Sequence, residues 1–132
     1  MPSKELKLIF LLSLPLIYLH ALEEVLGGFS HIDSFMQSGA SLFNTTPELF
    51  YWVSHVLYWL ALPTLFVLFK GSRLGMYLLV LFGFSYIFEL HHLIKALIAE
   101  SYYPGMITAS IYILFGIFFW TRLLKNLKIL NP

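Results

Sequence analysis

Four long apolar stretches, separated by short polar segments, make up most of the 132-residue chain. A helix rises about 1.5 Å per residue, so about 20 apolar residues cross the hydrocarbon core of a bilayer, which is roughly 30 Å thick. The pattern therefore predicts an all-α membrane protein, with a single domain of four transmembrane helices in an up-down bundle. The expected helices cover residues 6–26, 47–70, 74–99 and 106–124.

Local signals mark the ends of these helices. Gly27-Gly28 ends the first helix, and Thr46-Pro47-Glu48 supplies the N-cap, first position and acidic first turn of the second. Ser72 is a candidate cap for the third helix, and Tyr103-Pro104-Gly105 is expected to turn the chain into the fourth. Residues 27–46 are predicted to form an ordered outer loop, with a short interfacial helix or a lid as the alternative.

The distribution of positive charge predicts an orientation in the membrane. Seven of the eight Lys and Arg residues are expected at one face of the bundle, and Lys95 lies toward the other. By the positive-inside rule, both termini and the turn at Gly71 are predicted to be cytoplasmic, while the loops around Asp33 and Tyr103 face outward. The seven residues are Lys4, Lys7, Lys70, Arg73, Arg122, Lys125 and Lys128.

The composition agrees with an integral membrane protein. Hydrophobic residues make up 59% of the chain and charged residues only 11%, against about 25% charged residues in soluble domains. The lipid bilayer is therefore the expected partner, and a formal net charge of +1 gives no reason to expect nucleic acid. A homodimer is compatible with the small size, although no interface signal stands out. Because the chain has no cysteine, any metal must be held by His, Glu, Asp or backbone oxygen.

Ionisable residues interrupt three of the apolar stretches, where they are costly and usually functional. They are His20 with Glu23 and Glu24, then His55, and then Glu89 with His92. By the rise per residue, His20 and Glu89 lie roughly 21 Å and 22 Å from the inner ends of their helices, and His55 lies roughly 12 Å from the outer end. Three segments thus place imidazoles and carboxylates at a similar depth in the outer part of the bilayer.

The spacing of these residues also predicts shared helix faces. His20 projects with Glu23 and Glu24, and Glu89 projects with His92, because residues three and four apart are neighbours on a helix. A Glu-x-x-His pair that faces carboxylates from another helix is how helical bundles hold two metal ions. We therefore predict one or two divalent ions, with Zn, Fe or Mn favoured by these ligand types. The predicted ligands are His20, Glu23, Glu24, His55, Glu89 and His92.

Several alternatives stay open at this stage. A structural hydrogen-bond network would also explain the cluster, and His55 is as well explained as a satisfied interhelical histidine. Glu24 has a solvated interfacial carboxylate as its alternative, and His91 is expected to point away from the site. Tyr112 and Thr108 are candidates for lining the cavity.

The sequence resembles a known family at these positions. His20-x-x-Glu23-Glu24, continued by Gly27-Gly28-Phe29, resembles the HXXEE family of small bacterial membrane proteins, and so do His92 and the string Tyr103-Pro104-Gly105-Met106-Ile107-Thr108-Ala109. The resemblance implies that His20, Glu23, Glu24 and His92 belong to the site, and it implies the bacterial cytoplasmic membrane as the location. The family has no established activity, so the resemblance implies a site but no reaction.

The residues favour a membrane-embedded metalloenzyme. We predict hydrolase-type chemistry on a lipid-linked or amphipathic substrate, with Glu24 and Glu23 as catalytic residues and Glu24 as the natural general base. If the metal is iron, oxygen binding and oxidative chemistry are the alternative. One alternative is a metal-free acid–base enzyme, such as an isomerase that protonates a double bond in a lipid. Another is an ion or proton transporter, although the inner halves of the four expected helices lack ionisable groups that would make a path.

Overall fold

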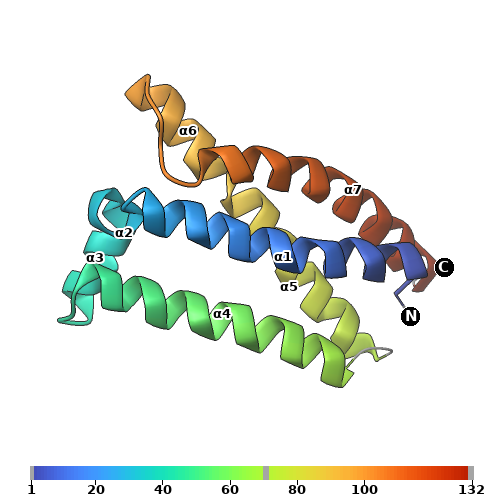
Figure 1. Cartoon of the computed structure of the whole chain (residues 1–132). Coiled ribbons are helices and arrows are strands. Elements are labelled where there is room, and N and C mark those ends of the chain that lie inside the picture. The colour runs from blue at the N-terminus through green and yellow to red at the C-terminus, as the bar shows by residue number, and fades with distance from the viewer. Residues whose placement is uncertain (1, 70–71, 131–132) are drawn as a thin grey trace.

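The computed structural model describes residues 2–69 and 72–130, and this part of the chain forms seven α-helices and no β-strand (Figure 1). Two short helices, α2 (Phe29–Ile32) and α3 (Ser34–Leu42), lie at one end of the bundle. The helices that run along its length are α1 (Lys4–Leu26), α4 (Pro47–Phe69), α5 (Arg73–Phe88) continued by α6 (Leu90–Ala99), and α7 (Met106–Leu130).

Three segments among the described residues are long and apolar enough to cross a membrane: α1, the combined α5 and α6 (Arg73–Ala99), and α7 over Met106–Leu127. This is consistent with the predicted membrane protein, but with three candidate spans rather than four. The remaining predicted span corresponds to α4, which is 23 residues long, as α1 is. Its crossing of a membrane stays a prediction.

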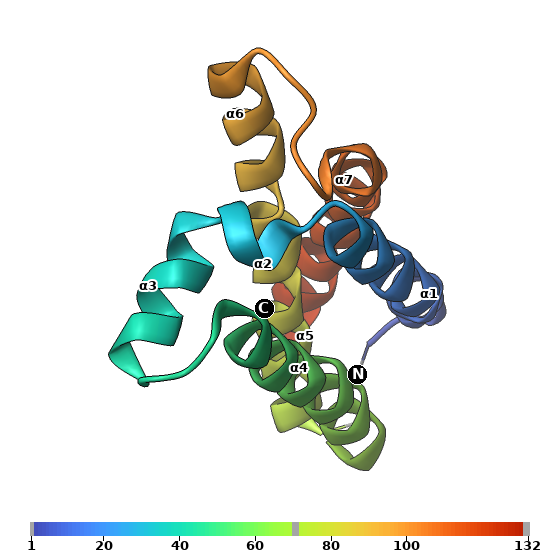
Figure 2. The same cartoon turned by 60° about the vertical axis from the view of Figure 1, so that its left-hand side comes forward.

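The two ends of the chain lie at the same end of the molecule, opposite α2 and α3 (Figure 1). α1 packs against α7, α7 packs against both α5 and α6, and α4 packs against α5. Figure 2 shows α2 and α3 as a bridge from the end of α1 to the start of α4. Which side of a membrane the chain ends face stays a prediction.

Most helix ends follow from local capping. The Thr46 hydroxyl accepts a hydrogen bond from the Leu49 amide at 3.2 Å, and the Ser72 hydroxyl accepts one from the Gly75 amide at 3.1 Å. Both residues therefore act as the N-caps that the sequence predicted. The predicted end of the second helix at Lys70 and Gly71 lies outside the described residues.

Three parts of the fold differ from the prediction. The stretch expected to be an ordered loop contains α2 and α3, because Asp33 caps α3 by accepting hydrogen bonds from the Phe35 and Met36 amides. The expected third helix is interrupted at Glu89, where the His92 amide bonds the Glu89 carbonyl, three residues back, in a 3₁₀-type turn. α7 continues past residue 124, and Asn126 on its added turns accepts a hydrogen bond from the Ser3 amide at 2.7 Å.

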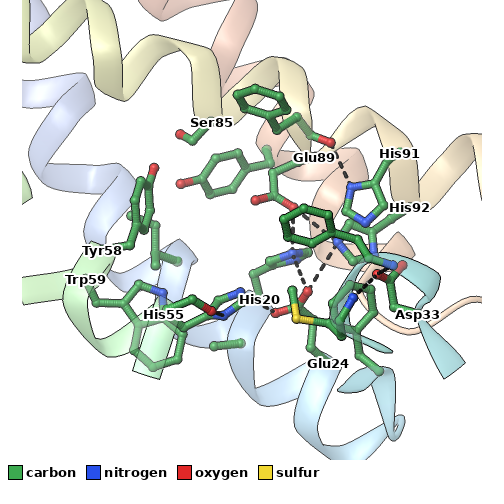
Figure 3. Close-up of a pocket in the computed structure, with 18 of the residues that line it drawn as sticks. His20, Glu24, Asp33, His55, Tyr58, Trp59, Ser85, Glu89, His91 and His92 are labelled. Atoms are coloured by element: carbon green, nitrogen blue, oxygen red, sulfur yellow. Dashed lines mark hydrogen bonds and ion pairs between the residues drawn. The ribbon is translucent and has the colours of Figure 1, made fainter. Parts of the chain in front are cut away.

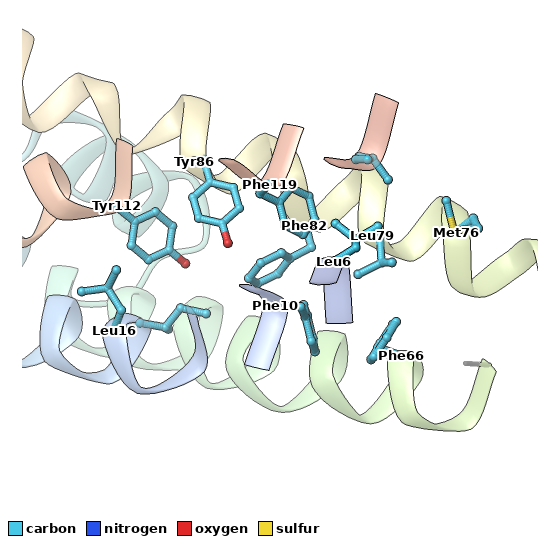
Figure 4. Close-up of a cluster of buried hydrophobic side chains, with 12 residues drawn as sticks. Leu6, Phe10, Leu16, Phe66, Met76, Leu79, Phe82, Tyr86, Tyr112 and Phe119 are labelled. Carbon is cyan, nitrogen blue, oxygen red and sulfur yellow. The ribbon is translucent and has the colours of Figure 1, made fainter. Parts of the chain in front are cut away.

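The apolar core fills the half of the bundle nearer the chain ends (Figure 4). Phe10 packs against Phe66 and Phe82, with ring centroids 4.5 Å and 4.8 Å apart. Within this core, Tyr86 makes a hydrogen bond with the Ser13 hydroxyl. This core joins α1, α4, α5 and α7 and leaves the other half of the bundle for polar side chains.

Candidate functional site

Two histidines and a glutamate from different parts of the chain meet in the half of the bundle near α2 and α3 (Figure 3). His20 comes from α1, His92 from α6, and Glu89 from the junction between α5 and α6. Glu89 Oε2 lies 2.8 Å from His20 Nε2 and 3.2 Å from His92 Nε2. These three ligand atoms lie within 4.8 Å of one another, so they could hold one metal ion. We call these three residues the His₂Glu group.

Glu24 is a second carboxylate directly beside the His₂Glu group. Its Oε1 atom lies 3.3 Å from His92 Nε2 and 3.7 Å from His20 Nε2, and the side chain is only 3% exposed. The other oxygen accepts a hydrogen bond from the Tyr51 hydroxyl at 2.8 Å and lies 3.8 Å from His55 Nε2. Glu24 therefore links the His₂Glu group on one side to two α4 residues on the other.

All three histidines are held by their Nδ1 atoms. His92 Nδ1 lies 2.6 Å from the Pro104 carbonyl and His55 Nδ1 lies 2.8 Å from the Tyr51 carbonyl. A carbonyl oxygen can only accept, so each Nδ1 carries the proton and each Nε2 of a neutral ring carries the lone pair. His20 Nδ1 has the equivalent contact with the Thr108 hydroxyl at 2.7 Å. Metal-binding histidines are typically oriented in this way by the nitrogen that does not bind.

The Nε2 atoms of His20 and His92 are buried and make no hydrogen bond of acceptable geometry within the described part of the chain. Their distances to Glu89 Oε2 are short, yet neither contact meets the geometric criteria of a hydrogen bond. Such buried polar atoms require an explanation. Two imidazole nitrogens and a carboxylate oxygen that converge in this way, without hydrogen-bond geometry, could instead coordinate one shared metal ion. The donor set of two imidazoles and a carboxylate suits Zn, Fe or Mn.

Glu23 lies outside this cluster and contacts α7 instead. Its carboxylate accepts hydrogen bonds from the Ile107 amide at 3.0 Å, the Thr108 amide at 2.8 Å and the Thr108 hydroxyl at 2.5 Å. It therefore caps the N-terminus of α7, where backbone amides and the helix dipole favour an anion. Since the Thr108 hydroxyl donates to Glu23, it accepts from His20 Nδ1–H and fixes that ring. The carboxylate that meets the His₂Glu group from α1 is Glu24, not Glu23.

The turn at residues 103–105 packs against the imidazole rings of His20 and His92. The Pro104 carbonyl holds His92, and the Pro104 ring lies so close to Gly27 that an added Cβ there would come within 2.6 Å. Gly105 has φ +90°, and a Cβ on it would lie 2.7 Å from His92 Cε1 and 2.8 Å from His20 Cε1. Both glycines are therefore required by close packing, and Gly105 also by its backbone conformation.

Asp33 forms a buried ion pair that the sequence pattern did not predict. It is 1% exposed, pairs with Lys95, and accepts a hydrogen bond from the Tyr103 hydroxyl at 2.8 Å. Burial raises the pKa of Asp33, but the hydrogen bonds from Lys95 and Tyr103 outweigh it, so the pKa lies below its ordinary value. Burial and the Asp33 carboxylate together raise the pKa of Tyr103. Lys95 was the clue in the sequence, because it is the one positive residue expected at the outer end of the bundle, where Asp33 also lies.

Of the six predicted ligands, the structure brings five together and places Glu23 apart. Their roles as metal ligands, and the catalytic roles of Glu24 and Glu23, stay predictions. His91 lies next to the site rather than in it, since its Nδ1 contacts the Phe88 carbonyl at 2.8 Å and its ring packs on His92. The five residues brought together are His20, Glu24, His55, Glu89 and His92.

The fold and the site define a helical protein with three helices suited to crossing a membrane and a His/Glu group that could hold a metal. The chain belongs to the HXXEE family, described as proteins of unknown function with an HXXEE motif, whose sequence profile matches residues 11–120. This confirms the family predicted from the motif at His20, Glu23 and Glu24. No curated protein and no solved structure matches the chain.

Proposed function

We propose that the protein is a membrane-embedded metalloenzyme of the hydrolase type. The observation that supports it best is the His₂Glu group, in which His20 and His92 are fixed through Nδ1 and turn Nε2 toward Glu89. Catalytic metal sites commonly use three protein ligands, including the set of two His and one Glu, and leave a position for water. The metal centre is therefore assigned to His20, His92 and Glu89.

Glu24 is the proposed general base. A divalent metal in such a site lowers the pKa of water and makes it a nucleophile near neutral pH. Glu24 lies beside the group, where its Oε1 can accept the proton of that water while Tyr51 holds its Oε2. The water oxygen then forms a bond to the carbonyl carbon or phosphorus of the substrate. The bond from that atom to the leaving oxygen breaks, and the leaving oxygen takes up the proton from Glu24.

A small cavity beside Glu24 gives water a route to the proposed base. It has a volume of about 210 Å³ and lies on the side of Glu24 that faces α2 and the start of α4. His31 and Glu48 line it, and both side chains are exposed and paired at 2.8 Å. Water can thus approach the proposed base from the end of the bundle.

The two alternatives make different use of the same residues. A metal-free acid–base enzyme would use the His20–Glu89 contact itself, which at 2.8 Å has hydrogen-bond length. A transporter would need a path through the rest of the bundle, and residues 8–19, 56–69, 74–88 and 107–121 contain no Asp, Glu, His, Lys or Arg. The transporter is therefore the less favoured reading.

Metal analysis of the purified protein tests the proposal. We expect about one Zn, Mn or Fe ion per chain, and at least a tenfold loss of affinity in His92→Ala and Glu89→Gln. The control is His31→Ala, because His31 is exposed and its partner is Glu48. Absence of bound metal, or equal loss in His31→Ala, contradicts the metal assignment.

The hydrolase assignment has its own test on p-nitrophenyl laurate and p-nitrophenyl phosphate as probes. Glu24→Gln is expected to retain the metal and lower hydrolysis by about 100-fold or more, the usual contribution of a general base. Activity that survives a strong chelator would point to the metal-free enzyme. No chelator-sensitive hydrolysis of either probe would contradict the hydrolase assignment while leaving the metal result intact.

A further inference from the structure

A large cavity extends from the His₂Glu group toward the side of the bundle (Figure 3). Its volume of about 660 Å³ lies within the range of small-molecule binding sites. His20, Glu24, Glu89 and His92 line its inner end. The cavity is therefore continuous with the proposed metal centre.

The lining changes from ionic and buried to apolar and exposed along the cavity. At the inner end, His92 is fully buried and Glu24 is 2% exposed. At the outer end, Leu81, Phe84 and Phe88 are 59%, 44% and 72% exposed. These three positions on α5 are spaced by three and four residues, so they form one continuous apolar stripe along that helix.

The outer end opens between α4 and α5, under α3. His55, Tyr58 and Trp59 form the α4 side of the cavity, and Phe35 of α3 borders it and is 68% exposed. α4 and α5 lie close at the end of the bundle that holds the chain ends and diverge toward α2 and α3 (Figure 1). The mouth is therefore on the side of the bundle, which in a membrane faces the acyl chains.

One polar group on the α4 wall is buried beside the cavity. The Tyr58 hydroxyl makes no hydrogen bond of acceptable geometry within the described residues. The Ser85 hydroxyl lies near it (Figure 3) and donates to the Phe82 carbonyl at 2.7 Å, so its oxygen is a neighbouring acceptor with which a ligand oxygen would compete for Tyr58. An unsatisfied buried hydroxyl beside a cavity is available to a ligand oxygen.

We propose that the cavity binds a single-chain amphiphile that enters sideways between α4 and α5. Its polar group lies at the His₂Glu group, one of its oxygens accepts a hydrogen bond from Tyr58, and its chain lies along Leu81, Phe84 and Phe88. The assignment of this amphiphile as the substrate rests on the proposed function. Its binding does not, because the cavity and its apolar mouth are formed by protein side chains.

Photolabelling of the purified protein tests this inference, with a diazirine-bearing palmitic acid as the probe. Labelled peptides are expected to come from the part of α5 that contains residues 81–88. Leu81→Trp should reduce this labelling by at least about fivefold, because the larger ring fills the mouth. The matched control is Leu114→Trp on α7, since Leu114 is 58% exposed and does not line the cavity.

Tyr58→Phe should weaken probe binding by about fivefold, the effect of one hydrogen bond.

Metal content measured on the same samples separates the two proposals. Labelling confined to the mouth supports the inference, whether or not metal is bound, and the absence of metal then counts against the proposed function alone. Labelling spread evenly over the exposed faces of the helices, or equal loss in Leu81→Trp and Leu114→Trp, overturns the inference.

Discussion

Glu23 and Glu24 are adjacent in the chain but contact different parts of the molecule. Glu24 faces His92 and Tyr51 in the interior, whereas Glu23 accepts hydrogen bonds from the first amides of α7 and from Thr108. Thr108 in turn fixes His20. The HXXEE motif therefore combines three roles on α1. His20 is a proposed metal ligand, Glu23 caps α7 and positions His20 through Thr108, and Glu24 is the proposed general base.

We expect Thr108→Val to weaken metal binding by about 10- to 100-fold, because it removes the hydroxyl that orients His20 without altering any proposed ligand. Thr121→Val on α7 is the matched control, since the Thr121 hydroxyl only bonds the Ile117 carbonyl. Metal titration of both variants measures the effect. Equal affinities would show that the contact between Thr108 and His20 does not matter for binding.

Glu23→Gln should also destabilise the protein by about 1 kcal/mol, the usual effect of a weakened N-cap. Thermal unfolding in detergent measures this change, with Glu5→Gln as the control because Glu5 pairs with Arg122 at the surface. If Glu23→Gln left both the stability and the metal affinity unchanged, Glu23 would not be needed to position Thr108 and His20.

At the scale of elements, the segment that contains α2 and α3 covers the site and is attached to α6 by a buried ion pair. Asp33 caps α3 and pairs with Lys95 of α6, and Tyr103 and His91 lie around the pair. A carboxylate whose pKa is lowered by folding stabilises the fold above its unfolded pKa of about 3.9 and loses this contribution as pH falls through the folded pKa. The attachment of α3 should therefore weaken in acid.

Hydrogen exchange of residues 34–42 measures this attachment. Asp33→Asn retains a capping side chain but removes the charge, so protection of these amides is expected to fall about tenfold at pH 7, as for the loss of a charged hydrogen bond. Wild-type protection, corrected for intrinsic exchange, should fall as the pH is lowered past about 3.9, the unfolded pKa of an aspartate. Glu48→Gln, which breaks an exposed pair with His31, should have little effect. Equal protection in both variants would contradict the role of Asp33.

The parts of the fold that depend on neighbouring residues in the sequence could be predicted, and the parts that depend on tertiary contacts could not. Thr46 and Ser72 cap helices through amides three residues away, so their sequence context was sufficient. The helix α3 was only the alternative to an ordered loop, because the ion pair that holds it in place joins Asp33 to Lys95, 62 residues away. The site followed the same rule: spacing put Glu23 and Glu24 near one face, but only the position of α7 separates their roles.

At the scale of the whole molecule, the ionic cluster lies toward one end of the bundle and the apolar core toward the other. The chain ends lie on the core side, where most of the positive residues are also found. This arrangement agrees with the proposed orientation, in which the ends are cytoplasmic and the site opens near the outer surface.

Because the chain contains no cysteine, single cysteines can test this orientation without a background signal. In intact bacterial cells, Ser41→Cys and Ser101→Cys are expected to react with a membrane-impermeant maleimide, because both exposed residues lie at the outer end. Lys125→Cys should react only after the cells are permeabilised. The opposite labelling pattern would reverse the proposed orientation.

Gly105 is packed against both His20 and His92, and a substitution there is expected to be as harmful as one at either histidine. Its α-hydrogens touch the edges of two imidazoles, so even the smallest side chain would wedge the rings apart and spread their nitrogen atoms. A mutational survey scored by function should therefore find this position as intolerant as His20 or His92, although glycine has no side chain to offer an ion.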